Sequence, residues 1–453
     1  MACSSPPMIG GELENPAVAV PVGRGRPRAS REIVAGLATF SAMASVLAVN
    51  PAILSVTGMD KGALVTATAL ATAIFTAGMA LATNYPVVMG PGGGINAYFA
   101  FTICGAMGVP WPAALGLVFY SGLLFLLMSV SGIRTRIVDA IPLELKLAIT
   151  CGIGLFVAFI GLQNGGLVVG NPHTLVTLGR LSDPRCLLTL GGVILIAALV
   201  WRKVRGAVII GVLALTVVCA FIPGAGGGRL AHLPSNPVGW PASLGPLFLK
   251  LDLGYLWTHF ASASIVVLAL LFVSIFDNLG TLIGVCSRAG LLDKDGRIPM
   301  IGRAFLADAG AVMLGACLGT STVTCYIESA VGVEEGGRTG MTAITAAVCM
   351  LLALFLTPLI LAIPMVATAP ALIVVGVFMM QDAARIGLGD FSKALAAVVT
   401  LFIIPLTFSI SDGIGIGLVV YAGFNLATGQ GRRVAPLAYV LSALFLAHAI
   451  WQR

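Results

Sequence analysis

Apolar residues run through this chain in stretches of about 16 to 25 residues, separated by short polar breaks. Runs of this length predict helices that cross a bilayer, because roughly 20 residues rising 1.5 Å each span its hydrocarbon core. Seven runs precede a long polar connection and seven follow it, at approximately 33–54, 63–83, 84–108, 111–131, 143–162, 186–201, 206–222 and then 260–287, 299–318, 319–337, 338–358, 366–382, 393–410 and 412–428. The pattern predicts an all-α polytopic membrane protein with 14 transmembrane segments.

The connection at 223–259 is rich in proline and glycine and is expected outside the cytoplasm, between a first repeat at 32–222 and a second at 260–430. An odd number of segments on each side requires the two halves to enter the membrane in opposite orientations. Such inverted repeats are typical of secondary transporters. Residues 1–31 read as a disordered cytoplasmic tail. In the C-terminal part, 431–453, the apolar run 434–451 has no counterpart and reads as an extra span or an interfacial helix.

The third segment of each half is interrupted by residues that break helices. The first carries Pro86 and the glycine-rich run 90–94, and its counterpart at 319–342 holds threonines, glycines and one central carboxylate. Both are expected to open with a short extended piece, at 85–89 and 321–326, and to continue as a short helix. Broken segments in matching positions predict a substrate site near the bilayer midplane, where half-helix N-termini offer N–H donors. The 90–94 run lacks the lysine of a phosphate-binding P-loop, so close backbone approach is the better interpretation.

Composition supports a membrane protein and places its N-terminus. The chain has 58% hydrophobic residues, 9% charged residues and a mean hydropathy of +1.04, outside the range of soluble globular proteins. A net charge of +7 alone would suggest a nucleic-acid partner, but the basic residues are distributed by side. Most of the lysines and arginines lie on one predicted face of the membrane. Five lie on the other face, and Arg453 is undecided; the five are Lys61, Arg180, Arg185, Arg229 and Lys250. This bias predicts a cytoplasmic N-terminus in an inner or plasma membrane, with lipid and not nucleic acid around the protein.

Two carboxylates within the apolar segments are candidates for an internal site. An acid at membrane depth costs about 3 kcal/mol on insertion scales, so such residues are usually functional. Glu328 lies in the second interrupted segment, and the alternative is that it only pairs with a basic residue at a helix end. Asp277 shares one helical face with Ser274 and Thr281, at spacings of three and four residues; its alternative is a cap at a helix break. We expect both acids to face an internal site.

Signatures of enzymes are missing from the sequence. The four histidines are isolated, and no His-Glu-x-x-His pair or clustered set of metal ligands occurs. No glycine-flanked nucleophilic serine has plausible histidine and aspartate partners. The nine cysteines form no Cys-x-x-Cys pair and read as small buried side chains. The sequence predicts a protein that is not an enzyme and that has no cofactor or metal.

Several motifs resemble one transporter family over nearly the whole chain, from Arg31 to about Tyr439. They read Asn-Pro-Ala-Ile-Leu at 50–54, Asn-Ala-Tyr-Phe-Ala at 96–100, Phe-Asp followed by Gly-Thr-Leu-Ile-Gly at 276–284, Gly-Thr-Ser-Thr at 319–322, Tyr-Ile-Glu-Ser at 326–329 and Gly-Gly-Arg-Thr-Gly at 336–340. The chain is similar to the AzgA-like purine permeases, which are guanine, hypoxanthine and adenine transporters of the nucleobase cation symporter-2 superfamily. The resemblance implies fourteen segments, a core domain of segments 1–4 and 8–11, a gate domain of segments 5–7 and 12–14, and proton-coupled uptake.

Carried over by position, the resemblance implies that Glu328 binds the purine, with Asn96 and Asp277 as further site residues. Departures occur beside these positions. Many relatives have an aspartate where this chain has Ser274 and a threonine where it has Asn278, and the loop before Asn96 reads Pro-Gly-Gly-Gly in place of Pro-Gly-Met-Gly. Loss of one acid leaves the preferred purine and the proton stoichiometry open.

The predicted function is import of a purine nucleobase by proton symport. The predicted substrate-binding residues are Glu328, Asp277, Asn96, Ser274, Thr281, Gly94 and Tyr326, and the proton-coupling residues are Asp277 and Glu328. An anion carrier of the sulfate or bicarbonate type is the alternative of the same architecture, and a membrane enzyme or receptor is a more remote one. The sequence leaves open whether the carrier is a monomer or a homodimer.

Overall fold

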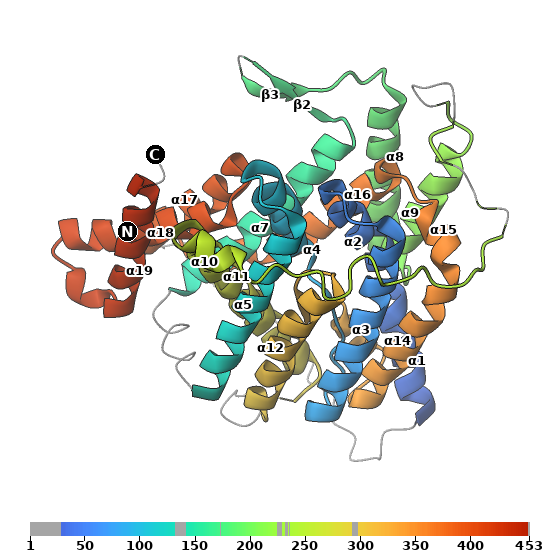
Figure 1. Cartoon of the computed structure of the whole chain (residues 1–453), viewed down its shortest axis with the longest axis horizontal. Coiled ribbons are helices and arrows are strands. Elements are labelled where there is room, and N and C mark those ends of the chain that lie inside the picture. The colour runs from blue at the N-terminus through green and yellow to red at the C-terminus, as the bar shows by residue number, and fades with distance from the viewer. Residues whose placement is uncertain are drawn as a thin grey trace, which may run out of the picture.

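Helices make up most of the chain in the computed structural model, which describes residues 29–131, 142–172, 174–223, 229–231, 234, 236–291 and 298–451 (Figure 1). The first half contains α1 (Ala29–Met43), α2 (Val46–Leu54), η1 (Ser55–Thr57), α3 (Lys61–Thr83), β1 (Met89–Pro91), α4 (Gly93–Ala97), η2 (Tyr98–Ala106), α5 (Trp111–Ser131), α7 (Leu143–Asn164), β2 (Val168–Asn171), β3 (Leu175–Leu178), α8 (Pro184–Trp201) and α9 (Ala207–Cys219).

The second half follows the long connection. It contains α10 (Tyr255–Thr258), α11 (Phe260–Arg288), α12 (Ile301–Leu318), β4 (Val323–Cys325), α13 (Ser329–Glu334), α14 (Gly340–Ala353), η3 (Leu354–Leu356), α15 (Thr357–Leu361), α16 (Met365–Met379), η4 (Met380–Arg385), α17 (Phe391–Thr407), α18 (Ile410–Ala427), η5 (Gly431–Arg433) and α19 (Pro436–Trp451).

The helical, multi-pass architecture expected from the hydrophobic runs is confirmed. Within the described ranges, eight helical stretches are long and apolar enough to cross a membrane, and four shorter apolar helices accompany them. The count of fourteen segments, the inverted repeat and the domain boundaries stay predictions. Most of the expected tail, residues 1–28, lies outside the described part of the chain, and helix α1 already begins at Ala29.

Two local features differ from the sequence-based expectations. Strand β1 forms at Met89–Pro91, later than the expected 85–89, because its partner strand sets which residues pair. The β2–β3 hairpin was not predicted at all. Each of its strands has four residues, too few to show a reliable alternation of buried and exposed positions. The hairpin projects beyond the ends of the helices (Figure 1).

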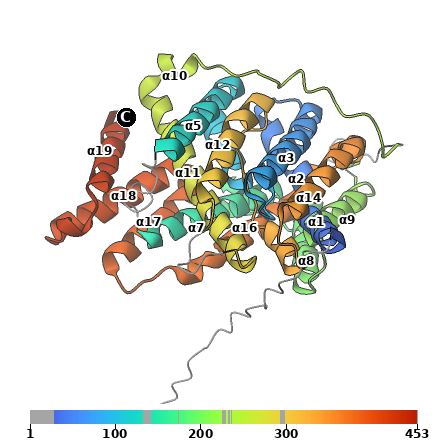
Figure 2. The ribbon, with the colours of Figure 1, turned by 90° about the horizontal axis from the view of Figure 1, so that it is seen from below.

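The helices pack in two groups that combine both halves of the chain. In the first group, here called the core layer, α12 packs on α5 and α3, α14 packs on α3 and α1, and α11 packs on α5. In the second, the gate layer, α7 packs on α16 and α17, α16 on α8 and α9, and α17 on α18. The two layers adjoin along the molecule (Figure 2). The division into core and gate domains that the family resemblance implies stays a prediction.

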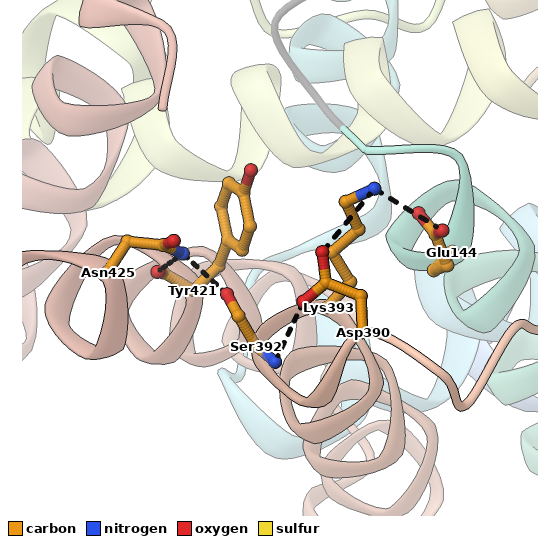
Figure 3. A network of polar contacts seen from close by, with 6 residues as sticks. All are labelled: Glu144, Asp390, Ser392, Lys393, Tyr421 and Asn425. Atoms are coloured by element: carbon orange, nitrogen blue, oxygen red, sulfur yellow. Dashed lines mark hydrogen bonds and ion pairs between the residues drawn. The ribbon is translucent and has the colours of Figure 1, made fainter. Parts of the chain in front are cut away.

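A polar network ties three gate-layer helices together near their ends (Figure 3). The Lys393 ammonium at the start of α17 lies 3.6 Å from a carboxylate oxygen of Glu144 on α7 and 3.7 Å from one of Asp390. On α18, the Asn425 amide donates to the Ser392 hydroxyl at 2.5 Å and to the backbone oxygen of Tyr421 at 2.8 Å. These bonds hold α7, α17 and α18 as one unit.

A buried acid fixes the turn before α14 in the core layer. The Glu32 side chain on α1 is 1% exposed, and its carboxylate accepts hydrogen bonds from the backbone N–H groups of Arg338 at 3.1 Å and Thr339 at 3.2 Å and from the Thr342 hydroxyl at 2.5 Å. It therefore satisfies donors at a helix N-terminus, where negative charge is also favourable. The 336–340 motif is a packing and capping turn, since a Cβ on Gly340 would lie 2.9 Å from the backbone oxygen of Ala80.

Replacement of this acid should destabilise the folded protein. We expect Glu32→Ala to lower the free energy of unfolding by about 3 kcal/mol, because buried donors lose their acceptor. Glu32→Gln should lower the free energy of unfolding by less, because the glutamine side chain has the same shape and keeps one acceptor oxygen. Thermal unfolding of the purified protein in detergent measures both. Asp390→Ala, which removes an exposed cap of α17, is the control and should cost about 1 kcal/mol or less. An Ala variant as stable as the control would contradict this role.

Candidate functional site

The two interrupted segments meet as a pair of short antiparallel strands. Met89 pairs with Cys325, Gly90 with Thr324 and Pro91 with Val323. The pairing extends one residue further at each end, because Tyr326 N–H donates to Val88 oxygen at 2.9 Å and Gly92 N–H donates to Thr322 oxygen at 3.2 Å. Every residue from 87 to 92 is buried. The strands supply each other's hydrogen bonds where no water is available.

The outer edge of β1 is also satisfied, by side chains. In an antiparallel pair, alternate residues direct their backbone groups away from the partner. At Met89, the Thr76 hydroxyl of α3 accepts from the N–H at 2.9 Å and donates to the carbonyl at 3.0 Å. At Pro91 there is no N–H to satisfy, and the carbonyl accepts from the Tyr326 hydroxyl. A strand with both edges satisfied can therefore lie in the middle of the helices.

Tyr326 lies across the strand pair because Gly90 has no side chain. A Cβ built on Gly90 would lie 2.9 Å from ring atom Cε2 of Tyr326 and 3.1 Å from Cζ, closer than side chains normally approach. The same Cβ would lie 3.4 Å from the Thr72 hydroxyl of α3. The Tyr326 hydroxyl donates to the Pro91 carbonyl, so the ring is held against the strand pair.

Both predicted acids lie beside this strand pair. Glu328 is the residue immediately before α13, and its carboxylate lies within electrostatic range of the Asp277 carboxylate and of the Tyr326 hydroxyl. On α11, Asp277 accepts a hydrogen bond from the Thr324 hydroxyl of β4 at 3.4 Å. Neither carboxylate has an ion-pair partner within the described ranges. The structure thus brings together Asp277, Tyr326 and Glu328, three of the seven predicted site residues.

Asn96 belongs to a hydrogen-bond network of amides and hydroxyls. It lies on α4, is 0% exposed, and its amide nitrogen donates to the side-chain oxygen of Asn50 on α2 at 2.5 Å. Asn50 in turn donates to the hydroxyls of Thr68 at 2.8 Å and Thr320 at 3.1 Å. The side-chain oxygen of Asn96 has no hydrogen-bond partner within the described ranges.

The other three predicted residues are buried without a described contact to the acids. Gly94 faces the gate layer, where a Cβ would lie 2.3 Å from Cγ2 of Ile153 on α7. Ser274 and Thr281 lie on α11 on either side of Asp277, and the Ser274 hydroxyl has no partner in the described part of the chain. Their membership of the substrate site stays a prediction.

Sequence reasoning missed three side chains: Thr324, which donates to Asp277; Thr72, whose buried hydroxyl lies near Gly90 without a described partner; and Asn50. The alternation of threonines at 320, 322 and 324 is a signal for the first, because in an extended strand these residues share one face. No comparable local signal marks Thr72, which lies within an ordinary apolar helix.

The site presents acceptors for hydrogen bonds and little positive charge. Two carboxylates and an aromatic ring lie together, and no group of three or more His, Cys, Asp or Glu residues among those described is arranged to hold a metal ion. The segment before β4 is also strained, since Ser321 has φ +64°, which non-glycine residues rarely adopt. Strain of this kind concentrates at functional sites.

Comparison with known proteins identifies the family. Residues 30–416 match the family model Xan_ur_permease, described as the permease family. The chain belongs to this family. It is 42% identical to the guanine/hypoxanthine permease PbuG of Bacillus subtilis, over 93% of this chain and 96% of that protein. It is 37% identical to the adenine permease AdeP of Escherichia coli K12, over 92% of each chain. This permease is therefore a multi-pass membrane transporter and not an enzyme.

The fold also resembles solved transporter structures. The transmembrane domain of BicA, a cyanobacterial bicarbonate transporter, superimposes with a TM-score of 0.62, covering 85% of this permease and 96% of that chain. The two sequences are 15% identical, so the likeness concerns the fold alone.

The close contact between Gly90 and Tyr326 can be tested directly. Gly90→Ala should reduce substrate affinity about tenfold or more, because the ring must move off the strand and loses its bond to Pro91. Gly93→Ala is the matched control, since a Cβ there meets nothing within 4 Å. Competition binding to both purified variants measures the effect. Equal affinities in the two variants would show that the ring position does not matter.

Proposed function

We propose that this permease carries purine nucleobases and that Glu328 and Asp277 bind the base. The observation that supports this best is a pair of neighbouring carboxylates, without a described cationic partner, beside two short paired strands. A purine base is flat, polar and uncharged, with N–H donors at its edge. Such a solute leaves water only when its donors and acceptors are satisfied again, because each unmet group costs about 1 to 3 kcal/mol.

The residues around the strands match these requirements. The Glu328 carboxylate accepts charge-assisted hydrogen bonds from N–H donors of the base. In guanine the ring N–H and the exocyclic amine are adjacent, so that both can bind the carboxylate together. The Tyr326 ring supplies an apolar face against which a planar base stacks. Guanine, hypoxanthine and adenine, which the names of PbuG and AdeP specify, all present at least two N–H donors. An anion, the substrate of BicA, would meet two negative charges in the same place.

Uptake by purified protein in liposomes tests this proposal. Labelled hypoxanthine or adenine should enter, and unlabelled purine bases should compete, whereas excess bicarbonate or sulfate should not. Glu328→Gln should lower uptake about 100-fold, which corresponds to roughly 3 kcal/mol of lost binding, because the charged acceptor is gone. Xanthine and uracil in the same competition series define which base is preferred.

Glu144→Gln provides the control for this substitution, since it alters a carboxylate that pairs with Lys393 in the gate layer, away from the strands. It should keep at least half of the wild-type uptake. Competition by bicarbonate in place of purines would favour the anion-carrier alternative, and normal uptake by the Glu328 variant would reject the assignment of that residue.

We further propose that a proton accompanies the base into the cytoplasm. A neutral base takes no energy from the membrane potential, whereas one proton gains about 2.3 kcal/mol per 100 mV. Two carboxylates without a described cation are also costly to carry through the membrane, and a proton bound at Asp277 or Glu328 reduces that charge. In this mechanism proton and base bind together from outside and are released inside.

Proton coupling predicts that adding base outside the liposomes acidifies their interior. A trapped pH-sensitive dye should report this in wild-type protein, and an inside-negative potential should speed it. Asp277→Asn should remove the acidification, while Asp390→Asn, an exposed acid of the gate layer, should not. Base uptake with no acidification in the wild type would identify facilitated diffusion or coupling to another ion.

A further inference from the structure

Asn50 links the two interrupted segments through a side-chain amide whose donors and acceptor are all hydrogen-bonded. The side chain is 2% exposed, so water does not satisfy it. Its nitrogen donates to Thr68 on α3 and to Thr320, three residues before β4, and its oxygen accepts from Asn96. With two N–H donors committed and the oxygen occupied, Asn50 has one orientation in this network.

The same network orients Asn96. An amide side chain is planar, with its oxygen and nitrogen on opposite sides, so a bond to one fixes the direction of the other. Because the Asn96 nitrogen points to Asn50, its oxygen points away from Asn50. That oxygen is an acceptor in a fully buried residue and has no partner among the described residues. Native proteins rarely leave such a group unpaired, which indicates a partner that the chain does not supply.

Further unpaired oxygens lie close to Asn96 in the fold. The hydroxyls of Ser321 and Thr322 are 0% exposed and lack partners within the described ranges. They follow Thr320, which is bonded to Asn50, and the Thr322 backbone is bonded to Gly92 at the start of α4. The unpaired oxygens therefore belong to the junction of the two interrupted segments.

We propose that Asn50 is a positioning residue that makes Asn96 an acceptor for a ring N–H of the bound base. This deepens the proposed function and rests on it. The two carboxylates and the Asn96 oxygen then all accept hydrogen bonds from the ligand. The site therefore selects ligands that carry N–H donors on more than one edge. A purine base meets this condition with the N–H of its five-membered ring and the donors of its six-membered ring. An analogue methylated at the matching nitrogen does not.

The test is a competition series of hypoxanthine and its 1-, 7- and 9-methyl derivatives on the purified full-length permease. Wild type should discriminate against at least one derivative. Asn50→Leu should reduce the affinity ratio between hypoxanthine and one methyl derivative about tenfold, because the hydrogen bond at that ring position is no longer oriented. The ratios for the other two derivatives should stay unchanged. Asn50→Asp should keep the wild-type pattern, because a carboxylate still accepts from Asn96 and both threonine hydroxyls can donate to it.

Asn425→Leu is the matched control for loss of a buried amide. Asn425 is 3% exposed and donates to Ser392 and to Tyr421 in the gate layer (Figure 3). Its replacement should lower thermal stability as much as Asn50→Leu does and leave the methyl-derivative pattern intact. Stability measured on all variants separates a loss of fold from a loss of orientation.

Four outcomes overturn the proposal. If Asn50→Leu weakens all four ligands equally, the network only supports the fold. If Asn50→Asp loses or inverts the wild-type pattern, then Asn96 donates to the base and does not accept from it. If the wild type binds none of these compounds, the purine function fails, and the role of Asn50 fails with it. Binding by the wild type with an unchanged pattern in Asn50→Leu rejects the role of Asn50 alone.

Discussion

Backbone hydrogen bonding in an apolar interior is the constraint from which the site of this permease follows. A chain that leaves helical geometry at membrane depth exposes N–H and C=O groups that lipid cannot satisfy. Here β1 and β4 satisfy each other's backbone hydrogen bonds. On the edge of β1 that faces away from β4, the hydroxyls of Thr76 and Tyr326 donate to the backbone carbonyls. Without the other strand, each would leave backbone N–H and C=O groups without hydrogen bonds. The two halves of the chain must therefore meet at these residues, and the register places Thr324 opposite Gly90.

Two kinds of polar group lie around the paired strands: groups with hydrogen-bond partners in the protein, and buried hydroxyls that have none within the described residues. The backbone groups of β1 are satisfied, and the Asn50 amide is satisfied as well. The hydroxyls of Thr72, Ser274 and Thr322, in contrast, are buried without a described partner. Unpaired buried oxygens lower stability, and those of Ser321 and Thr322 lie at the junction of the two interrupted segments, as expected for groups that bind a ligand. A rigid backbone with unsatisfied side chains is the arrangement that recognition of a polar solute requires.

Parts of this arrangement were predictable from the sequence and parts were not. Glycines and prolines in matching segments identified the two breaks, and Glu328 and Asp277 were recognisable because acids are rare in apolar runs. Glu32 was not, since it lies at the edge of a segment where an acid is unremarkable, and its three bonds go to residues more than 300 positions away. Asn50 and Thr72 were missed for the same reason: their roles depend on contacts between elements, which a local pattern does not encode.

Gly94 lies where the element that carries Asn96 meets the gate layer. Helix α4 carries Asn96 and follows directly on β1, and its Gly94 faces Ile153 of the gate layer, so close that a Cβ would overlap the isoleucine. A glycine at such a contact offers a smooth surface that another helix can slide across, whereas a side chain would interlock with it. Transport through a site between two layers requires one layer to move past the other. The element that holds the proposed ligand is thus in contact with the layer against which it must move, and a change in the position of α4 alters both the site and the contact.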